Sequence, residues 1–537
     1  MRCDGVKPVC GQCIHMEREY DCEYTDGPNL SPTQVLERNI SQLEARIRQI
    51  EAAPPTASTS ARPSRLSGAS GGSESQSSPI RERESASISD PSDIAVPSNR
   101  ALDPHPAVIR LLVSIFVPLA SQLGFFLNVP RFLDAVYMAD AALRRSRLSP
   151  CLLDAALLWG SRLSTNASIR AYETKLLARA VQSISDALPQ VASLQHNAVH
   201  IIQAEVLLSN YFFCQNRYLE GTYHCSAAVA LAMSCKVNRI RSSTADVESA
   251  DTARPTSFNL PPPVDAVEEG ERICAFWSVY TLDRSWSVAQ GAVANDVFGG
   301  VQVDTPWPVE MSVYEERGLP ADFRGSNTLF MFFNDPSPQF SGDGLSSLAL
   351  RAKSAALFEQ ATRLASQWSP TMHNFDAFYL DVLRLDNLIR HFIETLLPLN
   401  SLEAPVAPET AMDLLVTHTY AHAAAIRLHT RFEIADSILD RRDLSAARAA
   451  VAVLDCVNLA DLSFLDPIMA MLWTVVGQAL IESITQLGGD AFVDQRQALV
   501  HSLVRILNAL RKFTPVCPLM TSQASILNGE MQNRGIL

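Results

Sequence analysis

Apolar residues recur at helical spacing through most of this 537-residue chain. Such segments follow one another from position 105 to about position 515, whereas alternating patterns typical of strands are scarce. Because a 3.6-residue period places apolar side chains on one face of a helix, the pattern predicts an all-α fold. The predicted helices cover approximately 107–127, 130–146, 150–163, 194–214, 217–238, 265–290, 345–369, 375–397, 408–434, 442–460, 465–486 and 492–513, and a further stripe of Leu177, Val181, Ile184 and Leu188 is closed by Pro189.

The uncharged stretch from Leu111 to Pro130 raises the question of a membrane span. Polar residues, a proline and a glycine interrupt it, and Arg110 and Arg131 flank its two ends. A spanning helix needs about 20 predominantly apolar residues. We therefore predict a helix in the core of a folded domain and no membrane association.

Residues 53–104 are rich in Ser, Pro and Gly and contain few apolar residues. Such a composition cannot bury enough surface to offset the entropy of ordering, so the segment is predicted to be a disordered linker. It also contains a G-x-S-x-G match at Gly68–Gly72. In serine hydrolases that motif lies between a buried strand and a helix, and this polar segment predicts neither.

Four cysteines lie at the start of the chain with the spacing C-x6-C-x2-C-x8-C. Thiolates at short spacings are the ligands that Zn²⁺ prefers, so the cluster predicts a zinc site. A disulfide knot is the alternative. The remaining cysteines are scattered through apolar segments and no signal peptide is evident, which disfavours an oxidising compartment. The predicted ligands are Cys3, Cys10, Cys13 and Cys22.

A short heptad pattern follows the cysteines within residues 31–52. Isoleucine at a positions and leucine at d positions favour a parallel two-stranded coiled coil. An amphipathic helix packed on its own domain is the alternative, but the adjoining linker offers no surface for such packing. We therefore predict a homodimer. The apolar positions of the coil are Leu36, Ile40, Leu43, Ile47 and Ile50.

The cysteine segment resembles the C-terminal half of the fungal Zn₂Cys₆ binuclear zinc cluster, a DNA-binding domain. The segment CDGVKPVCGQC at 3–13, with Cys22-Glu23-Tyr24, carries the resemblance, and Pro8 falls on the loop proline of the family. The first two of the family's six cysteines and the basic stretch between them have no counterpart here. Residues 1–52 also carry six Lys and Arg against nine Asp and Glu. The resemblance thus implies a partial cluster, at residues 1–25, without its DNA-reading half.

Segments of the helical body resemble the fungal-specific transcription factor domain. Their order behind a cysteine cluster, a coil and a linker makes the resemblance specific. It implies a regulatory domain at residues 105–515, followed by a C-terminal tail at residues 516–537. The segments that carry it are Leu207–Ile240, ERICAFWSVYTLDRSW at Glu271–Trp286, DTPWP at Asp304–Pro308 and LHTRF at Leu428–Phe432.

Together these resemblances imply a zinc-dependent, sequence-specific transcription regulator of the RNA polymerase II type, located in the nucleus. Its partners would be double-stranded DNA at CGG-like half-sites, a second copy of the chain and the transcription machinery. Arg2 and Lys7 are expected to contact phosphates. The alternative is a helical interaction protein that has lost DNA binding. The acidic net charge of −13 argues against a nucleic-acid coat over the whole surface.

Two features of the body bear on catalysis. His418 and His422 form H-x3-H on a predicted helix, but Thr419 stands where a zinc protease needs its glutamate, so structural histidines are expected. Phe276 and Trp277 belong to an aromatic stripe that predicts core packing. Because the sequence shows no constellation of acid, base and nucleophile, we expect no enzyme, although a regulatory domain can hold an effector between its helices.

Overall fold

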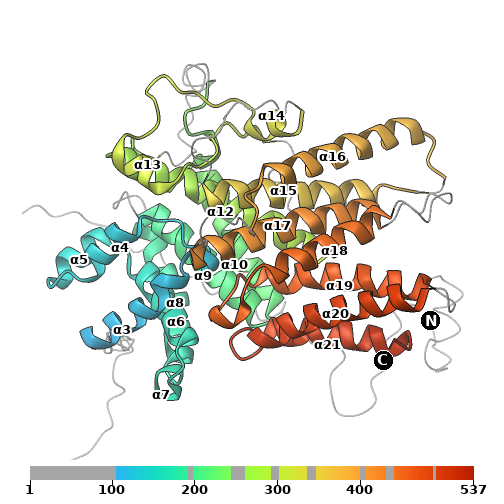
Figure 1. Cartoon of the computed structure of the whole chain (residues 1–537). Helices are drawn as coiled ribbons and strands as arrows, with labels where there is room; N and C mark the ends of the chain where they lie inside the picture. The colour runs from blue at the N-terminus through green and yellow to red at the C-terminus, as the bar shows by residue number, and fades with distance from the viewer. Residues whose placement is uncertain are drawn as a thin grey trace, which may run out of the picture. The chain divides into compact units, whose positions relative to one another are not determined.

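The computed structural model shows helices and no β-strand among the residues it describes (Figure 1), so the all-α prediction is confirmed. Residues 1–103 lie outside the described part. They contain the predicted cysteine ligands, Arg2, Lys7, the coil and almost all of the linker, and these predictions stay predictions. The described residues are 104–190, 197–243, 260–291, 301–334, 346–369, 371–399, 407–430, 441–487 and 492–536.

The N-terminal half of the helical body is built around α6 and α9. Helix α6 contacts α3, α8 and α9, and α9 in turn contacts α10 and α12. Both central helices are buried on almost every face, and Trp159 of α6 is fully buried. The helices of this half are α3 Pro106–Phe116, α4 Val129–Val136, α5 Ala141–Arg147, α6 Pro150–Leu163, α7 Ala167–Arg170, α8 Glu173–Ala187, α9 Asn197–Cys214, α10 Tyr218–Ser234 and α12 Ala266–Ala289.

In the C-terminal half, long helices lie side by side in a row, as Figure 1 shows from α16 to α21. Helix α17 contacts α15, α16, α18 and α19, and α19 contacts α20 and α21. Helix α12 joins the two halves, because it contacts α9 and α10 as well as α15 and α19. The helices are α13 Met311–Glu316, α14 Thr328–Asn334, α15 Ser347–Ser366, α16 Phe375–Thr395, α17 Pro408–His429, α18 Arg442–Asp455, α19 Ile468–Gln486, α20 Val493–Phe513 and α21 Pro518–Asn533.

The prediction of one continuous helix over 107–127 was wrong. Helix α3 ends at Phe116, and two short 3-10 helices follow, η3 at Val117–Leu119 and η4 at Ser121–Leu123. Gly124 then takes a φ of +81°. This left-handed conformation costs glycine little, and it ends the helical path and turns the chain toward the interior.

The predicted helix over 130–146 is divided into α4 and α5 because each half has its own N-cap. The Asn128 side chain accepts from the backbone N–H of Arg131 at 2.9 Å, and that of Asp140 accepts from the N–H of Ala142 at 2.7 Å. Each cap satisfies a backbone donor that a helix start leaves unpaired. Three basic residues lie in the last turn of α5, where cations complement the helix dipole: Arg144, Arg145 and Arg147.

Of the stripe predicted for α8, Ile184 is buried as predicted, whereas the other three positions are displaced by one residue. Leu177 is half-buried, and Val181 and Leu188 are 38% and 43% exposed. The buried stripe includes two alanines, which let α8 approach α6 closely where larger side chains would hold it away. Its members are Leu176, Ala180, Ile184 and Ala187.

The segment 516–537, predicted to be a tail, contains α21 and belongs to the core. Helix α21 packs against α19 and α20. Pro518 opens the helix at a position where its missing N–H costs nothing. Apolar residues at helical spacing then place one face against the neighbours, and the most deeply buried are Leu519, Met520, Leu527 and Met531.

Within the described residues one helix, α19, is long and apolar enough to cross a membrane by length and composition. Most of its surface is buried against α17, α18, α20 and α21. Helices that are apolar on all sides occur in the cores of large domains as well as in membranes. The packing of α19 is that of a core helix.

Candidate functional site

A cavity of about 370 Å³, partly open to solvent, lies between the two halves of the helical body. The loop after α3, helices α9, α12 and α17, the start of α13, and the beginnings of α15 and α19 contribute its walls. We call it the central cavity. Its volume is within the range of small-molecule sites, which are mostly apolar with a few polar groups. The apolar wall includes Phe125, Phe126, Leu282, Trp286, Leu348 and Ile468.

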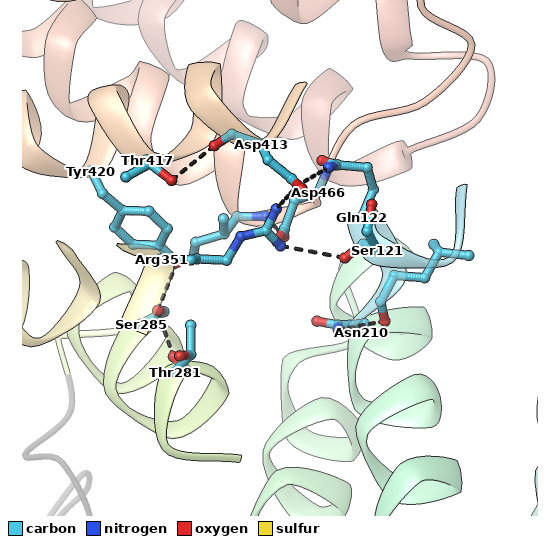
Figure 2. Close-up of polar contacts among 12 residues, drawn as sticks. Ser121, Gln122, Asn210, Thr281, Ser285, Arg351, Asp413, Thr417, Tyr420 and Asp466 are labelled. Atoms are coloured by element: carbon cyan, nitrogen blue, oxygen red, sulfur yellow. Dashed lines mark hydrogen bonds and ion pairs between the residues drawn. The ribbon is translucent and has the colours of Figure 1, made fainter. Parts of the chain in front are cut away.

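Arg351 bridges two carboxylates at the polar end of the central cavity. Its Nη2 donates to Asp413 Oδ1 at 2.7 Å and its Nη1 donates to Asp466 Oδ2 at 3.0 Å. The three residues come from α15, α17 and the segment just before α19, and Figure 2 shows them converging. Arg351 is only 7% exposed. Because an unpaired buried charge is costly, this group holds the three elements together.

Gln122 and the backbone complete the coordination of the two carboxylates. Gln122 Nε2 donates to Asp413 Oδ1 at 2.6 Å, and Asp466 Oδ1 accepts from the backbone N–H of Ile468 at 3.0 Å. Burial raises the pKa of Asp466, and the neighbouring Arg351 opposes part of this shift. One guanidinium therefore faces two carboxyl groups, of which Asp466 has the raised pKa.

A chain of hydroxyls continues the polar end along α12. Tyr420 Oη donates to Ser285 Oγ at 2.6 Å, Ser285 Oγ donates to the carbonyl of Thr281 at 2.6 Å, and Thr281 Oγ1 donates to the carbonyl of Trp277 at 2.7 Å. Because each of these three hydroxyl protons already forms a hydrogen bond within the protein, Thr281 Oγ1 and Ser285 Oγ can only accept hydrogen bonds from a ligand. Figure 2 shows Ser285 and Thr281 on one side of the space beside Arg351.

Asn210 of α9 lies on the opposite side of this space in Figure 2. Its Nδ2 donates to the carbonyl of Leu123 at 3.0 Å, which fixes the loop after α3 against α9. A Cβ at position 124 would lie 2.9 Å from the same Nδ2. Glycine is therefore favoured at position 124 for two reasons: it adopts the positive φ of the turn, and it leaves space for the Asn210 side chain.

The aromatic stripe of α12 packs in the core, as predicted. Phe276 and Trp277 are fully buried. The Trp277 ring stacks on that of Trp307 with centroids 3.9 Å apart, and Trp277 Nε1 donates to the carbonyl of Pro306 at 2.6 Å. The DTPWP segment is thereby held against α12, which leaves the hydroxyl-bearing face of the helix to line the central cavity.

Glu271, in the second turn of α12, is a buried carboxyl group whose ionisation should lower the free energy of unfolding. It accepts from the backbone N–H of Asn128 at 2.9 Å, and burial raises its pKa to about 7. A carboxyl whose folded pKa is raised destabilises the fold progressively as pH rises from its usual pKa to the folded value. Glu271→Gln keeps the acceptor and removes the charge, so we expect up to about 3 kcal/mol of added stability at about pH 8 and less than about 1 kcal/mol at about pH 5.

Chemical denaturation of the parent and the Glu271→Gln variant at both pH values measures this effect. Glu316→Gln on α13 is a matched control, because Glu316 is exposed. It should change stability little at either pH. An unchanged or lowered stability of Glu271→Gln at about pH 8 would contradict the expected cost of ionising Glu271.

The two histidines of the H-x3-H pattern lie on α17 and are buried in the protein core. His418 and His422 are each 7% exposed, and their rings lie 6.3 Å apart. The His418 Nε2 lies 3.0 Å from the carbonyl oxygen of Leu397. Burial lowers the pKa of His422 to about 4, so this ring is neutral near pH 7. Within the described ranges, no three His, Cys, Asp or Glu residues are placed to hold a metal ion.

Sequence reasoning missed the polar end of the central cavity. Arg351, Asp413 and Asp466 belong to no local motif. One signal was available: small or hydroxyl residues at steps of four, three and four on α12, namely Cys274, Ser278, Thr281 and Ser285, all of which line the cavity. Comparisons of the chain with protein-family models, with curated proteins and with solved structures gave no match.

Proposed function

We propose that this chain is a zinc-dependent transcription regulator of the fungal type, and that its helical body receives a small-molecule effector in the central cavity. The observation that carries the proposal is the cavity itself. It combines an apolar wall with a compact polar end, which is the usual composition of a ligand site. It lies in an all-helical body that follows the predicted cysteine, coil and linker segments in the chain.

In this proposal the N-terminal segments act on DNA. The cysteines bind Zn²⁺, the coil joins two copies of the chain, and the cations near the cysteines contact phosphates of double-stranded DNA in the nucleus. The resemblance of the cysteine segment to a binuclear zinc cluster supports this part. The residues concerned are Cys3, Cys10, Cys13, Cys22, Arg2 and Lys7 for metal and phosphate, and Leu36, Ile40, Leu43, Ile47 and Ile50 for the coil.

The chemistry of the cavity favours binding over catalysis. Arg351 is held in an ion-pair group by its two carboxylates, so it is not available as a catalytic acid. Burial raises the pKa of the Cys274 thiol to about 12, so at neutral pH this side chain is a thiol and a poor nucleophile. The hydroxyl of Ser285 donates to a backbone carbonyl and has no base in hydrogen-bond contact among the described residues. These groups are suited to orienting a ligand.

A tethered reporter assay tests the regulatory function independently of the N-terminal DNA contacts. The full chain is fused to a bacterial repressor's DNA-binding domain, and a reporter with that repressor's operator upstream of a polymerase II promoter is measured. We expect the full-chain fusion to change reporter output several-fold relative to the bacterial domain alone.

A fusion that carries only residues 1–104 is the matched control, because it lacks the helical body. It should leave the reporter unchanged if the body contacts the transcription machinery. Equal output from the full-chain fusion and the bacterial domain alone would contradict the proposed function. In that case the interaction protein without regulatory activity becomes the better interpretation.

A further inference from the structure

We infer that the central cavity takes a small amphipathic amine, in which an apolar body carries a protonated ammonium group. The inference rests on the effector site proposed above and deepens it by naming the chemical class of the ligand. Three properties of the cavity point to this class: the sign of its charge, the hydrogen-bonding capacity of its polar end, and the apolar character of its remaining wall.

The charged residues that line the cavity are three carboxylates and one guanidinium. Arg351 is shared between Asp413 and Asp466, and Glu310 stands at the exposed rim, where it accepts from the backbone N–H of Ser347 at 3.0 Å. Burial raises the pKa of Asp466 and so favours its protonated form, but Asp413 and Glu310 alone still outnumber Arg351, and the balance of charge on the wall is negative. Because the polar end is shielded from water, an anion there would meet uncompensated repulsion, whereas a cation would be attracted.

The carboxylates and the Thr281 and Ser285 hydroxyls at the polar end can act as acceptors toward a ligand. Asp413 Oδ1 already receives bonds from Arg351 and Gln122, whereas Asp413 Oδ2 accepts none from any described residue. Thr281 Oγ1 and Ser285 Oγ have used their protons and keep lone pairs. A ligand must supply donors to such a site, and an ammonium group supplies three together with the required charge.

The rest of the cavity wall is apolar and can bind the apolar part of such a ligand. Phe125 and Trp286 lie on it, together with the aliphatic side chains of Leu282, Leu348 and Ile468. Transfer of apolar surface from water to such a wall supplies affinity without orientation. The carboxylates then orient the ligand, because only one end of it can donate hydrogen bonds.

A series of three probes with one apolar body tests the inference on the full chain. The probes are 4-phenylbutylamine, 4-phenylbutan-1-ol and 4-phenylbutanoate, and their affinities are measured by isothermal titration calorimetry near pH 7. We expect the amine to bind about 10-fold more tightly than the alcohol, since a charge-assisted hydrogen bond exceeds a neutral one by this order. The carboxylate should bind most weakly. Equal affinities, or tightest binding of the carboxylate, would overturn the inference.

The Asp413→Asn variant locates the binding. It keeps the shape of the side chain, so we expect the amine to lose about 10-fold in affinity while the alcohol loses little. Asp494→Asn is the matched control, because Asp494 is exposed at the start of α20, and it should bind all three probes as the parent does. Unchanged amine binding by Asp413→Asn places the amine elsewhere and also overturns the inference.

The charge series on the parent chain decides the question even if Asp413→Asn fails to fold. The calorimetric result is also independent of the reporter assay. Preferential amine binding with an inactive reporter fusion would contradict the regulatory function alone. An active fusion with no preference among the probes would contradict the ligand class alone.

Discussion

An Arg351→Met variant is expected to lose about 3–5 kcal/mol of unfolding free energy, the cost of breaking a buried ion-pair group by removing one partner. Methionine fills similar space but leaves Asp413 and Asp466 without their shared cation. Both carboxylates are mostly buried, with side chains 14% and 13% exposed. Urea denaturation at neutral pH, followed by circular dichroism, measures the loss.

Two further variants separate this electrostatic cause from loss of packing. Adding Asp413→Asn and Asp466→Asn to Arg351→Met removes the repulsion, so the triple variant should recover much of the loss. Arg505→Met breaks the exposed ion pair of Arg505 with Asp455 and should cost at most about 1 kcal/mol. If Arg351→Met costs no more than Arg505→Met, or if the triple variant is no better than the single one, the proposed role of the ion-pair group is wrong.

A Gly160→Ala variant should lose about 3 kcal/mol of unfolding free energy, because the added methyl group has no space. Gly160 lies in α6 where α3 passes, and a Cβ there would lie 2.2 Å from the carbonyl oxygen of Leu112. The obstructing atoms belong to the backbone of α3, so no rotation of a side chain can relieve the contact. The two helices would have to separate, at the expense of the buried core between them.

The same substitution in an open position is the control. Gly529 lies in α21, and a Cβ added there would have no neighbouring group within 4 Å. At this position alanine improves helix propensity, so Gly529→Ala should add up to about 1 kcal/mol. Denaturation curves of the two variants should therefore move in opposite directions. A Gly160→Ala protein that is as stable as the parent would show that α3 and α6 can part at little cost.

Much of the fold could be predicted from local patterns. The helices at 150–163 and 375–395 begin and end within two residues of their predicted bounds, because apolar periodicity and flanking breakers act over a few residues. The core packing of Phe276 and Trp277 was predicted for the same reason. Predictions failed where one local pattern was compatible with two different buried faces of a helix. In α8, both Leu176 and Leu177 begin an apolar stripe, and only contact with α6 selects the former.

The central cavity could not be predicted in this way. Asp413 and Asp466 lie 62 and 115 positions from Arg351 along the chain. None of the three stands out in its own segment, because a charged residue in a helix usually faces solvent. They can form a ligand-binding group only because the fold brings them together and shields them from water.

By itself, the sequence determined that residues from 105 onward form helices, because the period of apolar residues is a property of neighbouring positions. It also determined which residues are candidates for zinc and for the coil, since those predictions depend on spacing alone. Only the tertiary structure decided that α21 joins the core, that α3 stops at Phe116, and that an arginine and two aspartates meet beside a cavity. Those outcomes depend on how helices distant in the sequence pack together, and packing is a property of surfaces that no local spacing specifies.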